Sequence, residues 1–90
     1  MPAKTVLLSP RAQKDYASLE QSVKDRIKQS LNELAAGSKR LDIKKLKGTG
    51  DREDLFRLRV GDYRIIYSPE SDIIRVVRID HRGKDYSWLD

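Results

Sequence analysis

Residues 55–67 read LFRLRVGDYRIIY, and this stretch predicts a β-hairpin. Apolar and charged side chains alternate over its first half, as expected for a strand with one buried face. Gly61-Asp62 is a two-residue connection in which glycine supplies a positive φ angle. A turn of this length sets the register, so we expect Leu58 to pair with Ile65 and Arg59 to pair with Arg64.

This register gathers Arg57, Arg59 and Arg64 on one face of the hairpin. Like charges directly opposite one another destabilise a sheet, whereas guanidinium groups match the geometry of phosphate oxygens. We therefore interpret this face as a binding surface for an anion. The alternative is a solvated face whose arginines pair with carboxylates of a neighbouring strand, such as Asp72 or Asp80.

The composition predicts a single small basic domain spanning residues 1–90, with 37% charged residues and a net charge of +5. Such a domain attracts polyanions, and nucleic acid is the first to consider. The chain has no cysteine and one histidine, so we expect no disulfide, no metal and no cofactor. Met1–Lys4 precedes no signal-like apolar region, and no apolar run is long enough to span a membrane. We expect a cytoplasmic protein without a membrane partner.

The N-terminal half predicts a strand followed by two helices. Thr5–Leu8 is typical of a short buried strand, and Ser9-Pro10 supplies the cap and first turn of a short helix. Ser22 and Asp25 resemble a capping box for the second helix, although a start two residues earlier also fits. Gly37 is expected to end this helix. Its apolar stripe comprises Val23, Ile27, Leu31 and Leu34.

The C-terminal half predicts strands. Leu41–Lys47 favours a short irregular strand, the hairpin follows, and Ile73 to about His81 is rich in β-branched residues. His81–Asp90 is expected to form a loop or a single helical turn. The order β-α-α-β-β-β-β predicts an α+β domain in which a helical hairpin packs on a curved, mainly antiparallel sheet.

This order and three motifs resemble the RelE/ParE superfamily of toxins from type II toxin–antitoxin systems, and its RelE-like branch in particular. The motifs are KLKG at 45–48, YRIIY at 63–67, and the terminal His81-Arg82 with Tyr86. The most specific stretch is LRVGDYRIIY at 58–67, and the likeness covers nearly the whole chain. The resemblance implies a toxin that inhibits translation by cutting mRNA on the ribosome.

The resemblance also implies the catalytic positions. Arg64 matches the phosphate-binding arginine after the hairpin turn, Arg82 the arginine that ends the last strand, and Tyr86 a C-terminal tyrosine assigned to catalysis or base stacking. Arg57 and Arg59 stand where the best-studied RelE branch has lysines. An arginine does not lose its proton, so these two can stabilise charge but cannot act as a general base.

Metal-independent RNA cleavage also needs groups that move protons. His81 has an ordinary pKa near neutrality, but alternation from Val77 and Ile79 points it toward the apolar face, so a packed structural histidine is an equal alternative. Tyr86 needs cationic neighbours to lower its pKa before it can act as a base, and it could instead stack on a nucleobase. The general base stays unassigned.

Three lysines before the central loop, Lys44, Lys45 and Lys47, are candidates for contacts with RNA phosphates. The alternative is a solvated run of charge.

The resemblance implies a cognate antitoxin with an acidic or amphipathic segment, the ribosome and mRNA as partners, and operator DNA only through the antitoxin complex. Two other functions stay open. One is a ParE-like gyrase poison without catalysis, and the other is a degenerate, non-catalytic relative that only binds its antitoxin.

Overall fold

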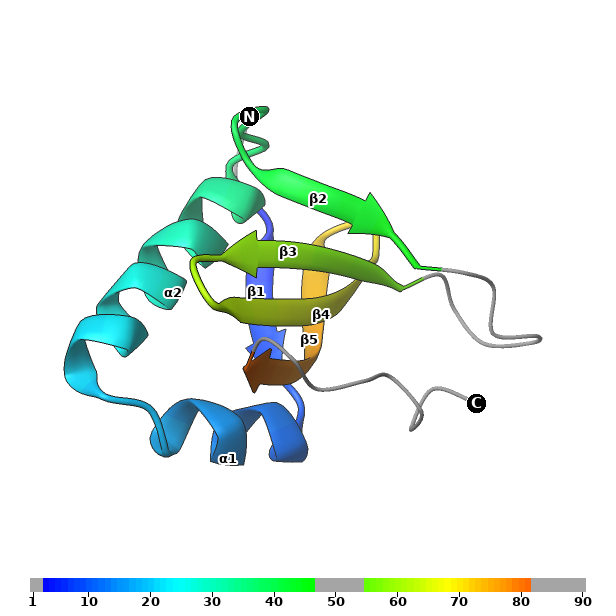
Figure 1. Ribbon diagram of the computed structural model, residues 1–90. Helices are drawn as coiled ribbons and strands as arrows, with labels where there is room; N and C mark the ends of the chain where they lie inside the picture. The colour runs from blue at the N-terminus through cyan, green and yellow to red at the C-terminus, as the bar shows by residue number, and fades with distance from the viewer. Residues whose placement is uncertain (1–2, 47–54, 82–90) are drawn as a thin grey trace.

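The computed structural model describes residues 3–46 and 55–81 (Figure 1). Its two helices and five strands follow the predicted β-α-α-β-β-β-β order, which confirms the α+β fold. The elements are β1 (Thr5–Leu8), α1 (Pro10–Ala17), α2 (Gln21–Ala35), β2 (Asp42–Lys45), β3 (Phe56–Val60), β4 (Tyr63–Pro69) and β5 (Ile73–His81).

The five strands form one sheet in the order β1-β5-β4-β3-β2. β1 is parallel to β5, and the other neighbouring strands are antiparallel. The mainly antiparallel character predicted from the sequence is confirmed. The central position of β4 places the hairpin strand with Arg64 in the middle of the sheet.

The β3–β4 hairpin has the predicted register. Leu58 pairs with Ile65 and Arg59 pairs with Arg64, because the Gly61-Asp62 turn adds only two residues between the strands. Gly61 has a φ of 58°, the left-handed conformation that glycine adopts without steric cost.

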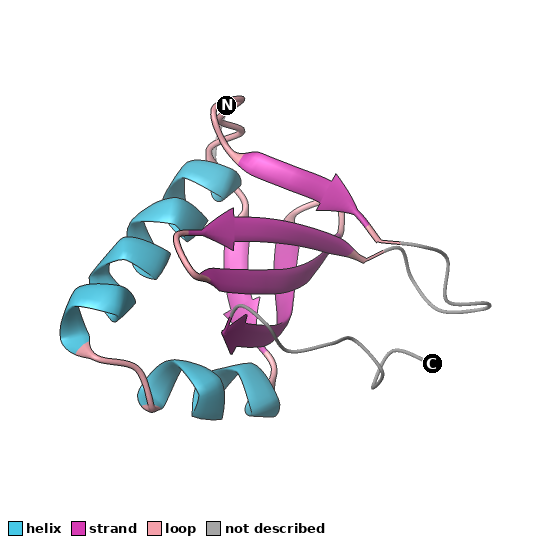
Figure 2. Ribbon diagram, viewed as in Figure 1, coloured by secondary structure: helices cyan, strands magenta, loops and turns pink. Residues whose placement is uncertain are grey.

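Both helices contribute to one hydrophobic core on one face of the sheet (Figure 2). Leu58, Ile65 and Val76 from the strands are completely buried there, as is Ile27 from α2. Burying such a side chain contributes about 1.5–3 kcal/mol. In Figure 1 the helices meet at a corner, joined by the short segment at 18–20.

The observed helix ends test the capping residues that were predicted from the sequence. Ser9 caps α1, since the Ala12 N–H donates to Ser9 Oγ at 3.1 Å, as predicted. The predicted capping box at Ser22 is wrong, and the alternative start two residues earlier is confirmed: Glu20 is the N-cap residue of α2 and makes no side-chain capping hydrogen bond. The Asp25 carboxylate instead accepts a hydrogen bond from the Gln21 side chain at 2.8 Å.

A register shift divides β5. Ile66 pairs with Arg78 whereas Tyr67 pairs with Val76, so Val77 is an extra residue of a β-bulge. Val76, and not Val77, therefore belongs to the buried core. The simple alternation expected through Val77 is therefore wrong, because the bulge interrupts it.

Neither helix of the described chain has the length and apolar character needed to cross a membrane.

Candidate functional site

Three guanidinium groups project from the face of the hairpin opposite the helices. Leu58 and Ile65 point into the core, so the residues that alternate with them point to the other side. We call Arg57 and Arg59 of β3 and Arg64 of β4 the arginine face. Arg59 and Arg64 lie directly opposite each other across the two strands.

Arg57 and Arg59 share one carboxylate. Arg57 Nη2 donates to Asp42 Oδ1 at 3.0 Å, and Arg59 Nη1 lies 4.0 Å from Asp42 Oδ2. Asp42 belongs to β2, where it pairs in register with Arg59. Its side chain is 55% exposed, so these ion pairs contribute at most about 1 kcal/mol. One carboxylate against two guanidinium groups leaves this part of the face positively charged.

Within the described residues, neither of the two carboxylates considered as partners forms an ion pair with the arginine face. Asp80 lies opposite Arg64 in register and accepts a hydrogen bond from Arg78 Nη2 at 2.8 Å. Asp72 lies exposed in the turn before β5 and makes no ion pair with the described residues. The partner of Arg57 and Arg59, Asp42, was missed by the sequence analysis.

The candidate lysines of β2 separate onto two faces. Lys44 pairs in register with Arg57, so it shares the face of the arginines and adds to its positive charge. Lys45 pairs with Phe56 and lies on the other face. Both are exposed. The further candidates Lys47, Arg82 and Tyr86 lie outside the described residues.

His81 is not brought together with the arginine face. It ends β5 opposite Tyr63, and the two rings meet edge to face with their centroids 4.9 Å apart. Ile79, two residues earlier, is buried in the core, so His81 points to the helix side, as alternation from Ile79 predicts. There it lines a cavity of about 270 Å³ together with Asp15, Ser18, Leu19, Tyr63 and Ile79.

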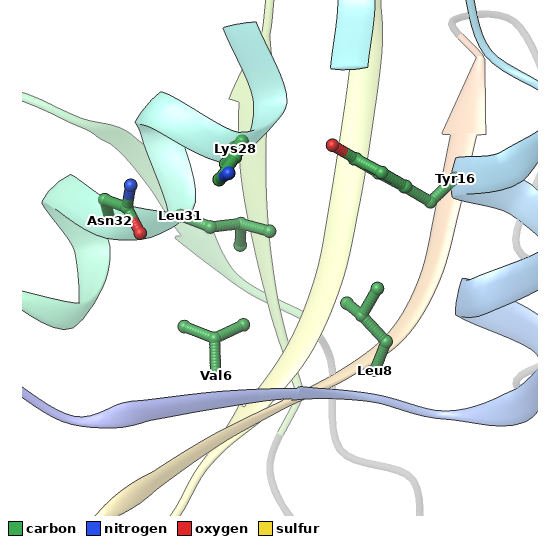
Figure 3. Close-up of a pocket in the computed structure, with 6 residues that line it drawn as sticks. All are labelled: Val6, Leu8, Tyr16, Lys28, Leu31 and Asn32. Carbon is green, nitrogen blue, oxygen red and sulfur yellow. The ribbon is translucent and has the colours of Figure 1, made fainter. Parts of the chain in front are cut away.

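A second cavity of about 270 Å³ lies between the helices and the edge strand β1 (Figure 3). In Figure 3 apolar side chains of β1 and α2 point toward one another across it. This lining suits an apolar side chain and offers little to a phosphate. The lining residues are Val6, Leu8, Tyr16, Lys28, Leu31 and Asn32.

Within residues 3–46 and 55–81, no three His, Cys, Asp or Glu side chains are grouped so that they could hold a metal ion. Burial raises the pKa of the Tyr67 hydroxyl above its ordinary value of 10.0. This tyrosine lies under the helix-covered face beside Phe56, with the ring centroids 5.8 Å apart. This shift reflects packing and carries no sign of acid–base catalysis.

Residues 6–86 match the model of a protein family described as the ParE toxin of the type II toxin–antitoxin system parDE. No curated protein matches the sequence significantly.

Solved structures of RelE toxins share the fold. The RelE–RelB complex from the archaeon Pyrococcus horikoshii has a chain that is 30% identical, with a TM-score of 0.74 over 93% of this chain and 100% of that one. The RelB–RelE complex from Methanococcus jannaschii gives 30% identity and a TM-score of 0.73 over 93% and 99%. The isolated Escherichia coli RelE toxin, at 21% identity, gives a TM-score of 0.71 over 96% and 92%, which shows the common fold.

Proposed function

Because the chain belongs to the RelE/ParE superfamily of type II toxin–antitoxin toxins, we propose that it is a ribosome-dependent endoribonuclease that cuts mRNA and thereby inhibits translation. The observation that carries this proposal is the arginine face. Arg59 and Arg64 are held opposite each other despite their like charges, and Arg57 and Arg59 have one exposed carboxylate between them.

The proposed reaction starts with attack of a ribose 2′-oxygen on the adjacent phosphorus. The new bond joins O2′ to phosphorus, the bond from phosphorus to O5′ breaks, and a base and an acid move the two protons. The products are a 2′,3′-cyclic phosphate and a 5′-hydroxyl end. Negative charge builds on the phosphorane oxygens, where preorganised guanidinium groups stabilise it.

The arginine face suits this task in its positive charge and in the exposure of Arg59. Arg57 is largely buried, with 16% of its side chain exposed, and its Nε is a buried donor without a hydrogen-bond acceptor. The positive charge of Arg57 can stabilise negative charge on a phosphate at this face. Arg59 is 45% exposed, so it is accessible to a ligand.

The remaining roles are part of the proposal. We assign Arg82 to phosphate stabilisation, Tyr86 to base stacking or proton transfer, and Lys44, Lys45 and Lys47 to RNA phosphate contacts. His81 has the weakest support for a catalytic role, because it packs on Tyr63 at the helix-covered face. The residue that removes the 2′-proton is not assigned.

A cognate antitoxin is the expected protein partner. The similar chains from P. horikoshii and M. jannaschii were both solved as complexes of RelE with RelB. We propose that this chain is neutralised in the same manner in the cytoplasm, and that it reaches operator DNA only as part of such a complex.

The test is primer extension on a defined mRNA incubated with the purified toxin, with and without programmed ribosomes. We expect cuts only when ribosomes are present, and chemical analysis should find a 2′,3′-cyclic phosphate on the upstream fragment. Equal cutting without ribosomes would remove the ribosome from the proposal, and 3′-hydroxyl ends would refute the mechanism.

A second candidate function is gyrase poisoning without catalysis, which is favoured by the match to the ParE family model over residues 6–86. A gyrase supercoiling assay with the same preparation distinguishes the two functions. Inhibited gyrase together with intact mRNA would replace the first proposal by the second. Loss of both activities, with antitoxin binding retained, would identify a non-catalytic relative.

A further inference from the structure

A series of polar contacts runs from α1 around the edge of β5. Asp15 Oδ2 accepts a hydrogen bond from the Ile79 N–H at 3.0 Å and lies 3.5 Å from Arg78 Nε. Arg78 Nη2 in turn donates to Asp80 Oδ1 at 2.8 Å. β1 reaches only as far as Leu8, opposite Val76, so the Asp15 carboxylate takes the place that a neighbouring strand would occupy at Ile79.

Asp80 is the most buried member of this series. Only 1% of the residue is exposed, and a buried carboxylate is costly unless cations and hydrogen bonds compensate for it. Its Oδ1 is used by Arg78, while its Oδ2 is buried and accepts no hydrogen bond. One oxygen of a buried anion thus remains available to a further cationic donor.

The register places that carboxylate directly across from Arg64. Side chains directly opposite in an antiparallel pair share a face, with Cβ atoms about 4.5–5.5 Å apart. Asp80 therefore stands between two arginine-bearing positions, Arg78 on its own strand and Arg64 on β4. Asp80 and Arg64 form no hydrogen bond with each other through Asp80 Oδ2, so the Asp80 charge would act on the Arg64 guanidinium through space, and such attraction is stronger at a buried site than in water.

We propose that Asp80 is a positioning residue for Arg64, and that Asp15 acts through Arg78 to hold Asp80 in place. This inference rests on the proposed function for its effect on catalysis. A cationic group contributes to transition-state stabilisation only when it is fixed before the charge develops. Asp80 of β5, supported by Asp15 of α1, would thus set the position of Arg64 within the arginine face.

The main test variant is Asp80→Asn, which keeps the shape of the side chain and removes its charge. We expect kcat for ribosome-bound mRNA to fall on the order of tenfold with KM little changed, because misplaced catalytic groups lower the rate of the chemical step. NMR of the Arg64 side-chain Nε–H group should show increased mobility. Arg75, which pairs with Glu70 at 3.2 Å on another part of β5, should be unaffected.

The matched variant is Asp15→Asn, one contact further from Arg64 and on the other side of the β5 edge. We expect a smaller change of the same kind in kcat and in Arg64 mobility. This variant also decides the matter if Asp80→Asn does not fold. Unchanged kcat and unchanged Arg64 mobility in the folded variants would overturn the inference.

The NMR measurement separates this inference from the proposed function. If the wild-type protein cuts no mRNA but Asp80→Asn loosens Arg64, the positioning role stands and the nuclease assignment fails. If the wild-type protein cuts mRNA and Arg64 is equally mobile in both proteins, the nuclease assignment stands and the positioning role fails.

Discussion

The two faces of the β3–β4 hairpin differ in almost every physical respect, although they alternate along the same strands. On the helix side, Leu58 and Ile65 face each other in register and are completely buried. On the opposite side, the next pair in the ladder brings Arg59 against Arg64. One face gains free energy of folding by removing apolar surface from water, while the other holds like charges together at a cost.

This contrast indicates that residues needed for stability and residues proposed for activity alternate along the same two strands. Substitutions on the helix side should lower stability and affect activity only through folding. Substitutions on the arginine face should lower activity and change stability little. The separation makes each face the control for the other.

The largest expected effect is on stability, from Ile65→Ala at the buried centre of the sheet. Ile65 is 0% exposed, and truncating such a side chain costs about 2–5 kcal/mol through lost burial and the cavity left behind. Urea denaturation measures the change. The matched variant Arg59→Ala, on the other face, should change the free energy of unfolding by less than about 1 kcal/mol, because it removes an exposed ion pair and an opposed charge. Equal losses in the two variants would remove the contrast between the faces.

Gly61→Ala tests whether the turn of the hairpin is held by its backbone conformation or by its neighbour in α2. A left-handed conformation costs a residue with a Cβ about 1–2 kcal/mol, and a Cβ on Gly61 would also lie 2.8 Å from Arg26 Nη2. Gly37 has a φ of 81° with nothing within 4 Å of an added Cβ, so Gly37→Ala reports the backbone cost alone. We expect thermal unfolding to show a greater loss for Gly61→Ala. Adding Arg26→Ala should remove the excess, and an excess that persists would exclude the contact as its cause.

Asp42→Asn tests whether Asp42 neutralises part of the positive charge of Arg57 and Arg59. Removing their shared carboxylate should strengthen binding to a single-stranded RNA oligonucleotide at low salt. It should also steepen the slope of log Kobs against log salt concentration by roughly 0.7, the value for one additional phosphate contact. Asp72→Asn, at an exposed turn position without an ion pair to the described residues, changes the net charge equally and serves as the control. Identical slopes for the two variants would indicate a general charge effect.

The smallest expected effect concerns Tyr67 and the pH dependence of stability. Burial raises the pKa of the Tyr67 hydroxyl above 10.0, so the folded protein holds this proton more tightly than the unfolded chain. The stability linked to this bound proton is therefore fully present below pH 10, the ordinary pKa, and is lost as the pH rises from 10 through the folded pKa. Tyr67→Phe should flatten this alkaline loss in urea denaturation curves. An unchanged alkaline slope would assign the loss to other groups.

Local signals in the sequence were sufficient for the hairpin, because a two-residue turn fixes the register of everything it connects. The same holds for α1, where Ser9 offers a cap that the backbone uses. Local signals did not decide between the two expected starts of α2, because its N-cap residue Glu20 makes no side-chain capping hydrogen bond. The bulge at Val77 was also hidden, because both Val76 and Val77 fit an apolar strand position.

The candidate site was predictable to the same extent as the hairpin that carries it. Placing Arg57, Arg59 and Arg64 on one face follows from alternation and turn length. The carboxylates around them could not be foreseen: Asp42 reaches the arginines through the register of β2, which no tight turn fixes. The contact of Asp15 with Ile79 joins residues 64 positions apart, so no local pattern encodes it.

The central claim is that the arginine face carries the activity while the helix-covered face carries the stability. Its most direct test is the rate of mRNA cleavage on programmed ribosomes by Arg64→Ala, measured together with the free energy of unfolding of the same preparation. The account predicts a rate reduced by about a hundredfold or more, an unfolding free energy within about 1 kcal/mol of the wild-type value, and wild-type behaviour for the control Arg75→Ala. Cleavage at the wild-type rate by folded Arg64→Ala would contradict it.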